Sequence, residues 1–506
     1  MHRSAIAAAL ALRLSTVAQA DDEPAPPEPA PEPAPAPPDA PLEASPEAVP
    51  SREVPQTADQ VRSAPRQEDA RGQIRDEDRS GDWVLWIPRV ILFPVRVAVT
   101  IIGYPISLAL YALELYNLTS RVKSWFFNEE GTVGLYPVAF AETGFGLNGG
   151  GRLILRRLGG TDIGVTARAS FGGRFRQLFS TKLSTGRTFE RATLDLRASY
   201  EIRPKDQFFG IGDGDVLEDP PAMPVDARSE LHESRFRQDA LRVGIQTTYR
   251  PHRTVHIGVS GAIIHRSFGA AEEDFEIDDD GEPDDDIEEQ LANNFDVTTV
   301  NRFVEGSSTM YAEIEATWDT RHAPSRFESA ATPSAGWYLQ GFAGYTTGFD
   351  GDPTKYFRYG LDLQRFLRLA EGPRSLAVRL KCEGVTGGYR DVSFYDLPKL
   401  GGPLLLRGYA LDQYRDRFAA LGSLEYQFDA AEFFGGFLFV DAGRVYSKPE
   451  DIGVTGLRMG FGGGIQLHSK RNFLGRLTIA SSPDADVFVS LSFDPVYDTR
   501  ARVERR

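Results

Sequence analysis

From Gly131 onward, apolar and polar side chains alternate, and charged residues recur at every second position. In residues 192–202, for example, alanine, leucine, tyrosine and isoleucine occupy one face, whereas Asp195, Arg197 and Glu201 occupy the other. Successive side chains of a β-strand point to opposite faces, and a packed soluble core does not accept rows of ionised groups without partners. In a transmembrane β-barrel the charged face meets a wet lumen and the apolar face meets lipid. The pattern therefore predicts strands of such a barrel.

Sixteen such runs follow one another, and a tilted strand needs only about 9–11 residues to cross a bilayer. They lie near residues 131–142, 145–156, 163–171, 175–184, 190–201, 236–249, 254–266, 308–319, 335–346, 356–368, 374–386, 416–428, 435–446, 456–468, 473–481 and 485–493. The long connections, near 202–235, 267–307 and 387–415, all follow odd-numbered runs, which is typical of barrels with both termini in the periplasm. Connections after even-numbered runs are short except near 320–334. We therefore predict an all-β fold, an antiparallel barrel of about sixteen strands over residues 131–497.

The beginning of the chain has the composition of an export signal followed by a linker. Residues 1–20 combine a basic start, a short apolar run and the small-x-small pattern Ala18-Gln19-Ala20, which predicts a signal peptide. Residues 21–80 are rich in proline, alanine and glutamate and contain little to bury, so we expect a disordered linker. Together with the barrel, the signal predicts export to the bacterial outer membrane.

Residues 81–130 are apolar and are predicted to be helical in part, although Pro88, Pro94 and Pro105 interrupt them. Residues 97–113 contain no charge, and their length is near the lower limit of about 17 residues for a spanning helix. Three interpretations stay open: an anchor in the inner membrane, a helix in the membrane interface, or a segment packed on or inside the barrel mouth. The barrel that follows directly argues against the first, because one chain would then bridge two membranes.

Two motifs lie in the last third of the chain; one contains an arginine and the other an aspartate. They are Arg407-Gly408-Tyr409, preceded by Leu406, and Phe439-x-Asp441-x-Gly443. The first lies in the connection before the twelfth strand, and the second lies on the thirteenth. Alternation places Asp441 in the lumen, since Leu438, Val440 and Ala442 form the apolar face, and it places Glu425 of the twelfth strand there too.

With these motifs, and with WDTRHAPSRF and DQFFGIGDGD upstream, the region from about 131 to 493 resembles the BamA/TamA superfamily, or bacterial surface antigen family. In that family the loop before the twelfth strand folds back into the barrel, and its arginine pairs with lumenal carboxylates. The resemblance implies that Arg407 meets Asp441, with Glu425 as a second partner. A guanidinium suits this task because its planar fork holds two carboxylate oxygens at once. Gly408 would allow close approach to the wall, and Tyr409 would pack against it.

The final strand, 485–493, ends on an aromatic residue. Val489, Leu491 and Phe493 share its lipid face and resemble the C-terminal signal by which barrels reach their assembly machinery. A basic tail, 498–506, continues past this signal.

The resemblance implies a role in the insertion, assembly or translocation of outer-membrane components. A weak junction between the first and last strands would open and template a client strand. Expected partners are outer-membrane lipid, lipopolysaccharide and unfolded outer-membrane proteins. Family members with such roles usually carry periplasmic POTRA repeats, and residues 20–131 show no β-α-α-β-β pattern. The alternative is therefore a passive channel or structural barrel without insertase activity.

Composition and motifs exclude several other classes of function. The net charge of −16 argues against nucleic acid as a partner. Residues 272–289 contain thirteen acidic residues and no basic one. They offer Asp278, Asp280 and Asp284 as weak cation ligands, and a solvated loop is the competing interpretation. With a single cysteine, Cys382, the chain forms no internal disulfide. No nucleophile elbow, zincin motif or phosphate-binding loop is present, so we predict neither an enzyme nor a cofactor.

Overall fold

A computed structural model describes the barrel region and little of the chain before it. The described residues are 125–142, 146–172, 176–186, 188–213, 222, 233–272, 290–322, 332–369, 374–431, 434–468, 473–483 and 487–492. The predicted signal peptide (1–20), linker (21–80) and basic tail (498–506) lie outside them, as do residues 81–124 of the predicted apolar segment. Within the described ranges, no helix has the length and apolar character to cross a membrane.

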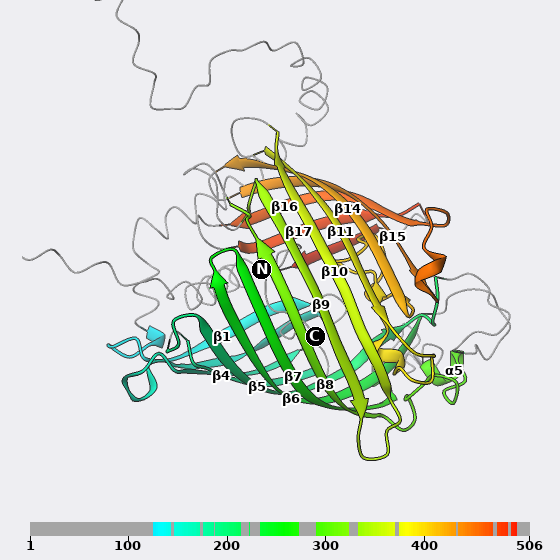
Figure 1. Cartoon of the computed structure of the whole chain (residues 1–506), viewed down its shortest axis with the longest axis horizontal. Helices are drawn as coiled ribbons and strands as arrows, with labels where there is room; N and C mark the ends of the chain where they lie inside the picture. Colours follow the sequence, from blue (N-terminus) through cyan, green and yellow to red (C-terminus); the bar gives the residue numbers. More distant parts are fainter. Residues whose placement is uncertain are drawn as a thin grey trace, which may run out of the picture. The chain divides into compact units, whose positions relative to one another are not determined.

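Sixteen strands form one antiparallel sheet in which each strand pairs with the next along the sheet (Figure 1). They are β1 (Val133–Glu142), β2 (Gly146–Leu155), β3 (Gly164–Gly172), β4 (Arg176–Ser184), β5 (Ala192–Phe208), β6 (Ser234–His252), β7 (Val255–Ala270), β8 (Ser307–Asp319), β9 (Gly336–Gly348), β10 (Lys355–Arg368), β11 (Arg374–Val385), β14 (Phe418–Ala431), β15 (Phe434–Tyr446), β16 (Arg458–His468), β17 (Phe473–Ser481) and β18 (Val487–Ser492). Two short strands, β12 (Lys399–Leu400) and β13 (Tyr414–Arg415), pair separately inside the β11–β14 connection. Among the described residues, helix is limited to short pieces such as α5 (Leu291–Asn294). The predicted all-β fold of about sixteen strands is confirmed.

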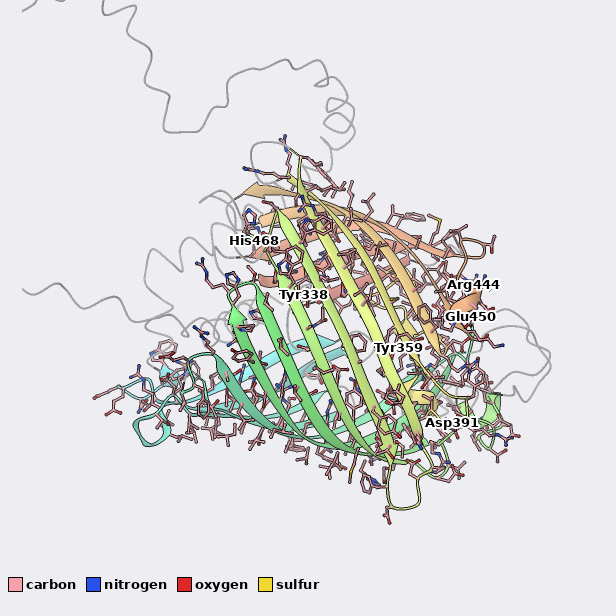
Figure 2. The ribbon with its side chains drawn as sticks, in the orientation of Figure 1. Tyr338, Tyr359, Asp391, Arg444, Glu450 and His468 are labelled. Atoms are coloured by element: carbon pink, nitrogen blue, oxygen red, sulfur yellow. The ribbon has the colours of Figure 1, made fainter. Side chains whose placement is uncertain are left out.

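Exposure alternates along the strands as the sequence predicts. On β8, Met310, Ile314 and Trp318 are exposed, whereas Glu313 and Thr317 are buried. Figure 2 shows side chains standing on both faces of the sheet. Large apolar side chains exposed along a whole strand are unfavourable in water and favourable against hydrocarbon. The exposed face is therefore the lipid face, and the other lines the lumen.

The first and last strands approach each other without pairing. Cα atoms of β1 and β18 come within 8 Å, but the described residues contain no ladder between them. We call this junction the seam. Each strand therefore keeps one edge that has no partner strand in the described part of the sheet.

The C-terminal part of β5 departs from simple alternation. A β-bulge lies between Arg203 and Asp206, where the pairing with β6 shifts by one residue. Such an extra residue reverses the faces of the residues after it, so Phe208 points into the lumen although its even number would place it on the lipid face. The strand also continues to Phe208, beyond the predicted end at residue 201.

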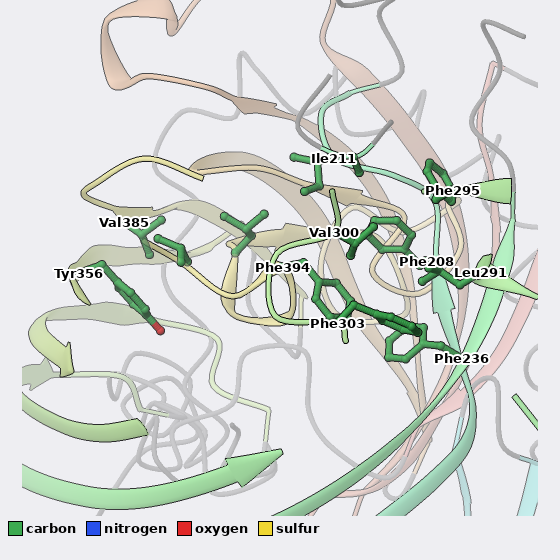
Figure 3. Packing of buried hydrophobic residues seen from close by; sticks show 13 residues of the cluster. Phe208, Ile211, Phe236, Leu291, Phe295, Val300, Phe303, Tyr356, Val385 and Phe394 are labelled. Atoms are coloured by element: carbon green, nitrogen blue, oxygen red, sulfur yellow. The ribbon is translucent and has the colours of Figure 1, made fainter. Parts of the chain in front are cut away.

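Described parts of the three long connections, which follow β5, β7 and β11, pack together with residues of the neighbouring strands (Figure 3). The buried apolar residues of these connections and of the adjoining strands form what we call the loop cluster: Phe208, Ile211, Ala222, Phe236, Leu291, Phe295, Val300, Phe303, Tyr356, Val385, Val392, Phe394 and Leu397. At its centre, the ring of Phe236 lies 5.5 Å from that of Phe394 and 6.1 Å from that of Phe303. These connections are therefore packed structure with an apolar core of their own.

Phe236→Ala should lower the free energy of unfolding of the detergent-folded protein by about 3–5 kcal/mol, because the ring is fully buried and its removal leaves a cavity. Urea unfolding followed by tryptophan fluorescence measures the loss. The matched control is Phe357→Ala, since Phe357 is 59% exposed on the lipid face. Equal losses in the two variants would show that the loop cluster contributes no packing energy of its own.

Candidate functional site

Arg407 lies inside the barrel and is held by the wall. Its Nε and Nη2 atoms donate to the two carboxylate oxygens of Asp441 on β15, both at 2.8 Å. Its backbone N–H donates to the same carboxylate at 3.0 Å. The guanidinium carbon also lies 3.6 Å from the centre of the Phe439 ring. The structure thus brings together the arginine and the aspartate that the two motifs contain.

Glu425 on β14 joins a second arginine to this group. Its Oε2 atom accepts from Nη1 of Arg407 at 2.5 Å and from Nη2 of Arg476 on β17 at 2.7 Å. Ser423 donates to Asp441, and Gln427 donates to the other oxygen of Glu425. All these side chains are buried. Two carboxylates face two guanidinium groups, so the cluster is balanced in charge and its acceptors are used.

Gly408 and Tyr409 bring the loop against the last strands. Gly408 has a φ of +97°, and a Cβ atom there would lie 2.5 Å from the carbonyl oxygen of Ser481 on β17. On β16, a Cβ on Gly460 would lie 1.6 Å from the carbonyl oxygen of Arg407. The hydroxyl of Tyr409 donates to the carbonyl of Met459 at 3.2 Å. Glycine is needed on both sides of this contact, because the two backbones meet directly.

A cavity of about 140 Å³ lies between the loop and the end of the sheet. Gly402, Tyr409 and Leu411 of the loop line it together with Phe488 and Ser490 of β18. The loop that carries Arg407 is therefore a direct neighbour of the last strand.

The base of the same loop is fixed by a second set of charges. Nζ of Lys399 on β12 donates to Asp412 at 2.8 Å. Arg415 on β13 donates to the carbonyl of Gln207 at 2.9 Å, and its guanidinium carbon lies 4.9 Å from the centre of the Phe208 ring. Burial alone would raise the pKa of Asp412, but Lys399 and Arg415 outweigh it and hold the pKa below its usual value.

Some of the remaining predicted residues lie within the described ranges and others do not. Gly443 lies on the lumenal face of β15, where a Cβ would come within 2.9 Å of the carbonyl oxygen of Ala420. Val489 and Leu491 are exposed on the lipid face of β18. Phe493 and the acidic residues Asp278, Asp280 and Asp284 lie outside the described residues. In the part of the chain that the structure describes, no group of three or more histidine, cysteine, aspartate or glutamate side chains could hold a metal.

Sequence reasoning missed Arg476, Ser423 and Gly460. Alternation on β17 does place Arg476 in the lumen, since its neighbour Leu477 is exposed on the lipid face. Its partner Glu425 lies 51 residues earlier in the chain, on β14, which does not pair with β17. Only the three-dimensional arrangement identifies this contact.

Arg407→Ala should lower the free energy of unfolding by about 3–5 kcal/mol, because it leaves Asp441 buried without its main partner. Heat-modifiability on gels and urea unfolding measure the loss. Arg407→Lys should recover only part of it, since an ammonium cannot bridge both carboxylates as a fork.

The matched control is Arg379→Ala, which breaks a buried pair with Asp362 between two strands of the wall, β11 and β10. Protease cleavage within residues 401–411 should increase in Arg407→Ala and remain at the wild-type rate in Arg379→Ala. Equal cleavage in both would mean that Arg407 does not hold the loop.

The pair of Asp412 and Lys399 predicts an acid-sensitive component of stability. Because the folded pKa of Asp412 lies below the unfolded value of about 3.9, its contribution is present above about pH 4 and is lost as the pH falls through the folded pKa. The difference in unfolding free energy between wild type and Asp412→Asn should therefore be largest near neutral pH and shrink in acid. A difference that is constant from pH 7 to pH 3 would contradict this.

Part of the barrel region is similar to known proteins. Residues 288–480 match the Omp85 superfamily domain. No curated protein matches the chain. Among solved structures, BamA from Haemophilus ducreyi lacking POTRA domains 1–3 is 12% identical, with a TM-score of 0.49 and coverage of 71% of this chain and 69% of that one.

CdiB from Acinetobacter baumannii is 10% identical, with a TM-score of 0.43, and CdiB from Escherichia coli is 11% identical, with a TM-score of 0.42. Each alignment covers 71% of this chain, but only 58% and 60% of the two CdiB chains. The described residues contain no POTRA repeat. The family match confirms the predicted resemblance to the BamA/TamA superfamily: residues 288–480, which lie within the β-barrel, match the Omp85 superfamily domain.

Proposed function

We propose that this barrel acts in the insertion, assembly or translocation of outer-membrane components, with unfolded outer-membrane proteins as its clients. The observation that carries the proposal is the seam, where β1 and β18 are adjacent but unpaired in the described residues. The proposal includes export by the predicted signal peptide and contact of the lipid face with outer-membrane lipid and lipopolysaccharide.

Unpaired strand edges have a chemical consequence inside a membrane. Each backbone N–H or C=O left without a partner in hydrocarbon costs several kcal/mol. An extended client segment can supply those partners by adding a strand to the edge. The seam is thus a place where the barrel gains hydrogen bonds from an unfolded client, and the client gains a template.

The loop that carries Arg407 would set the position of the strands beside the seam. Gly408 touches Ser481 on β17, and the loop borders the same cavity as Ser490 on β18. Asp441 on β15 and Glu425 on β14, which are further from the seam, bind the side chain of Arg407. In this proposal the charged cluster is a structural lock: through the loop, it joins β17 and β18, which lie beside the seam, to β14 and β15.

The loop cluster weighs against the alternative, a passive channel. A channel that conducts permanently needs a continuous wet path, whereas aromatic side chains of two long connections, Phe295 and Phe394 among them, pack around the lumenal Phe208 (Figure 3). A steady open state in single-channel recordings would favour the passive channel.

Depletion of the protein, followed by proteomics of purified outer membranes, tests the proposed function. We expect other barrels to fall in abundance while inner-membrane proteins keep their levels. Complementation with wild type should restore the barrels, and Arg407→Ala should restore them less well than Arg379→Ala. An unchanged outer-membrane proteome after depletion would overturn the proposal.

A further inference from the structure

The free edge of β1 can be identified residue by residue. The backbone N–H of Arg156 donates to the carbonyl of Thr132 at 2.7 Å, on the side of β2. The carbonyl of Val133 instead accepts from the backbone N–H of Asn128 at 2.9 Å. In an antiparallel strand the backbone groups of successive residues point to alternate sides. The backbone N–H and C=O groups of even-numbered residues of β1 therefore point to β2, and those of odd-numbered residues point to the seam.

Asn128 occupies the start of this edge. Besides the bond from its backbone, its side-chain oxygen Oδ1 accepts from the N–H of Val133 at 2.9 Å. Both backbone groups of Val133 are thus used within a tight turn over residues 127–134. The first position of β1 that points to the seam has no hydrogen bond to offer another strand.

The turn is anchored by an aromatic contact on the lumenal side. Phe127 forms a bridge with Gly134, on the edge of β1 opposite to its pairing with Ile154 of β2. The Phe127 ring stacks on Tyr136 at 6.2 Å, and a Cβ at Gly134 would lie 2.3 Å from that ring. The absence of a side chain at Gly134 therefore provides the room in which Phe127 sits.

Pro137 interrupts the same edge further along. Pairing between β1 and β2 is unbroken from Val133 to Glu142, so the alternation holds at Pro137, which points to the seam. Proline has no N–H, and within sheets it is tolerated where the missing donor faces away from a ladder. Between Val133 and Pro137, Leu135 is the other residue whose backbone groups point to the seam, and it lies beside the bridge between Phe127 and Gly134.

We propose that Asn128 and Pro137 block the first half of the free edge of β1, so that the seam with β18 can pair only beyond Pro137. The two blocks act by different means, one by occupying backbone groups and the other by lacking a donor. The first half of the junction then stays open to lateral separation. The relevance to clients rests on the proposed function, whereas the hydrogen-bond pattern of the seam does not.

Hydrogen–deuterium exchange of the folded protein in detergent tests this directly. Pro137→Val supplies the missing N–H and a residue that favours strands. We expect the amide at position 137 to be protected, and the amides of residues 487–492 to exchange more slowly by on the order of five-fold, with a higher unfolding temperature. Leu135→Val is the control, because it changes the same edge without adding a donor.

Asn128→Ala removes the acceptor for the N–H of Val133, so this amide should exchange faster than in wild type, and Asn128→Asp should restore its protection. The proposal is overturned if the amide at position 137 exchanges at the rate of an unpaired amide while β18 is unchanged. It is also overturned if Asn128→Ala leaves Val133 protected. Neither outcome depends on client assembly, so failure of the proposed function would be seen separately in the depletion experiment.

Discussion

Every backbone N–H and C=O that enters hydrocarbon must have a hydrogen-bond partner, and this constraint organises the rest of the molecule. It explains why the wall is a single sheet in which each strand pairs with the strands before and after it in the order of the sheet. It also explains why the seam matters, since β1 and β18 are the two strands whose outer edges the described sheet does not pair. An edge that was merely exposed would invite unwanted pairing. The features of β1 near Pro137 and Asn128 reduce that hazard.

Charge inside the barrel obeys a second constraint, because an ionised group out of water needs a partner. The lumen meets it with arginine–carboxylate pairs between strands, as in Arg379 with Asp362, and with the shared arrangement of Arg407, Arg476 and Glu425. The shared arrangement differs from a wall pair because one member comes from a loop. A loop arginine that neutralises two wall carboxylates makes the position of the loop a condition for the stability of the wall.

Much of this could be predicted from the sequence, because lipid and lumen impose a two-residue period that is visible in residue type. Strands such as β8 and β15 lie within a residue or two of their predicted places. The outcome for β5 differs, because a bulge between Arg203 and Asp206 reverses the faces. Pro204 lies within it, and proline inside a strand pattern is a signal of a bulge. The pairing of Arg407 with Asp441 could be predicted from family motifs and alternation together. Arg476 was missed because alternation gives its face but not its partner. The packing of the long connections was also missed, since their apolar residues are scattered along the chain.

The loop cluster has a consequence for the order of folding. It joins Phe208, Phe295 and Phe394, which are spread over about half of the length of the barrel sequence. Contacts between such distant residues require large loops to close first, and they form late. During biogenesis the lumen would therefore remain uncovered until β11 and the connection after it had arrived. The covering of the barrel is thus a late checkpoint, and a chain truncated before Phe394 would leave an uncapped sheet.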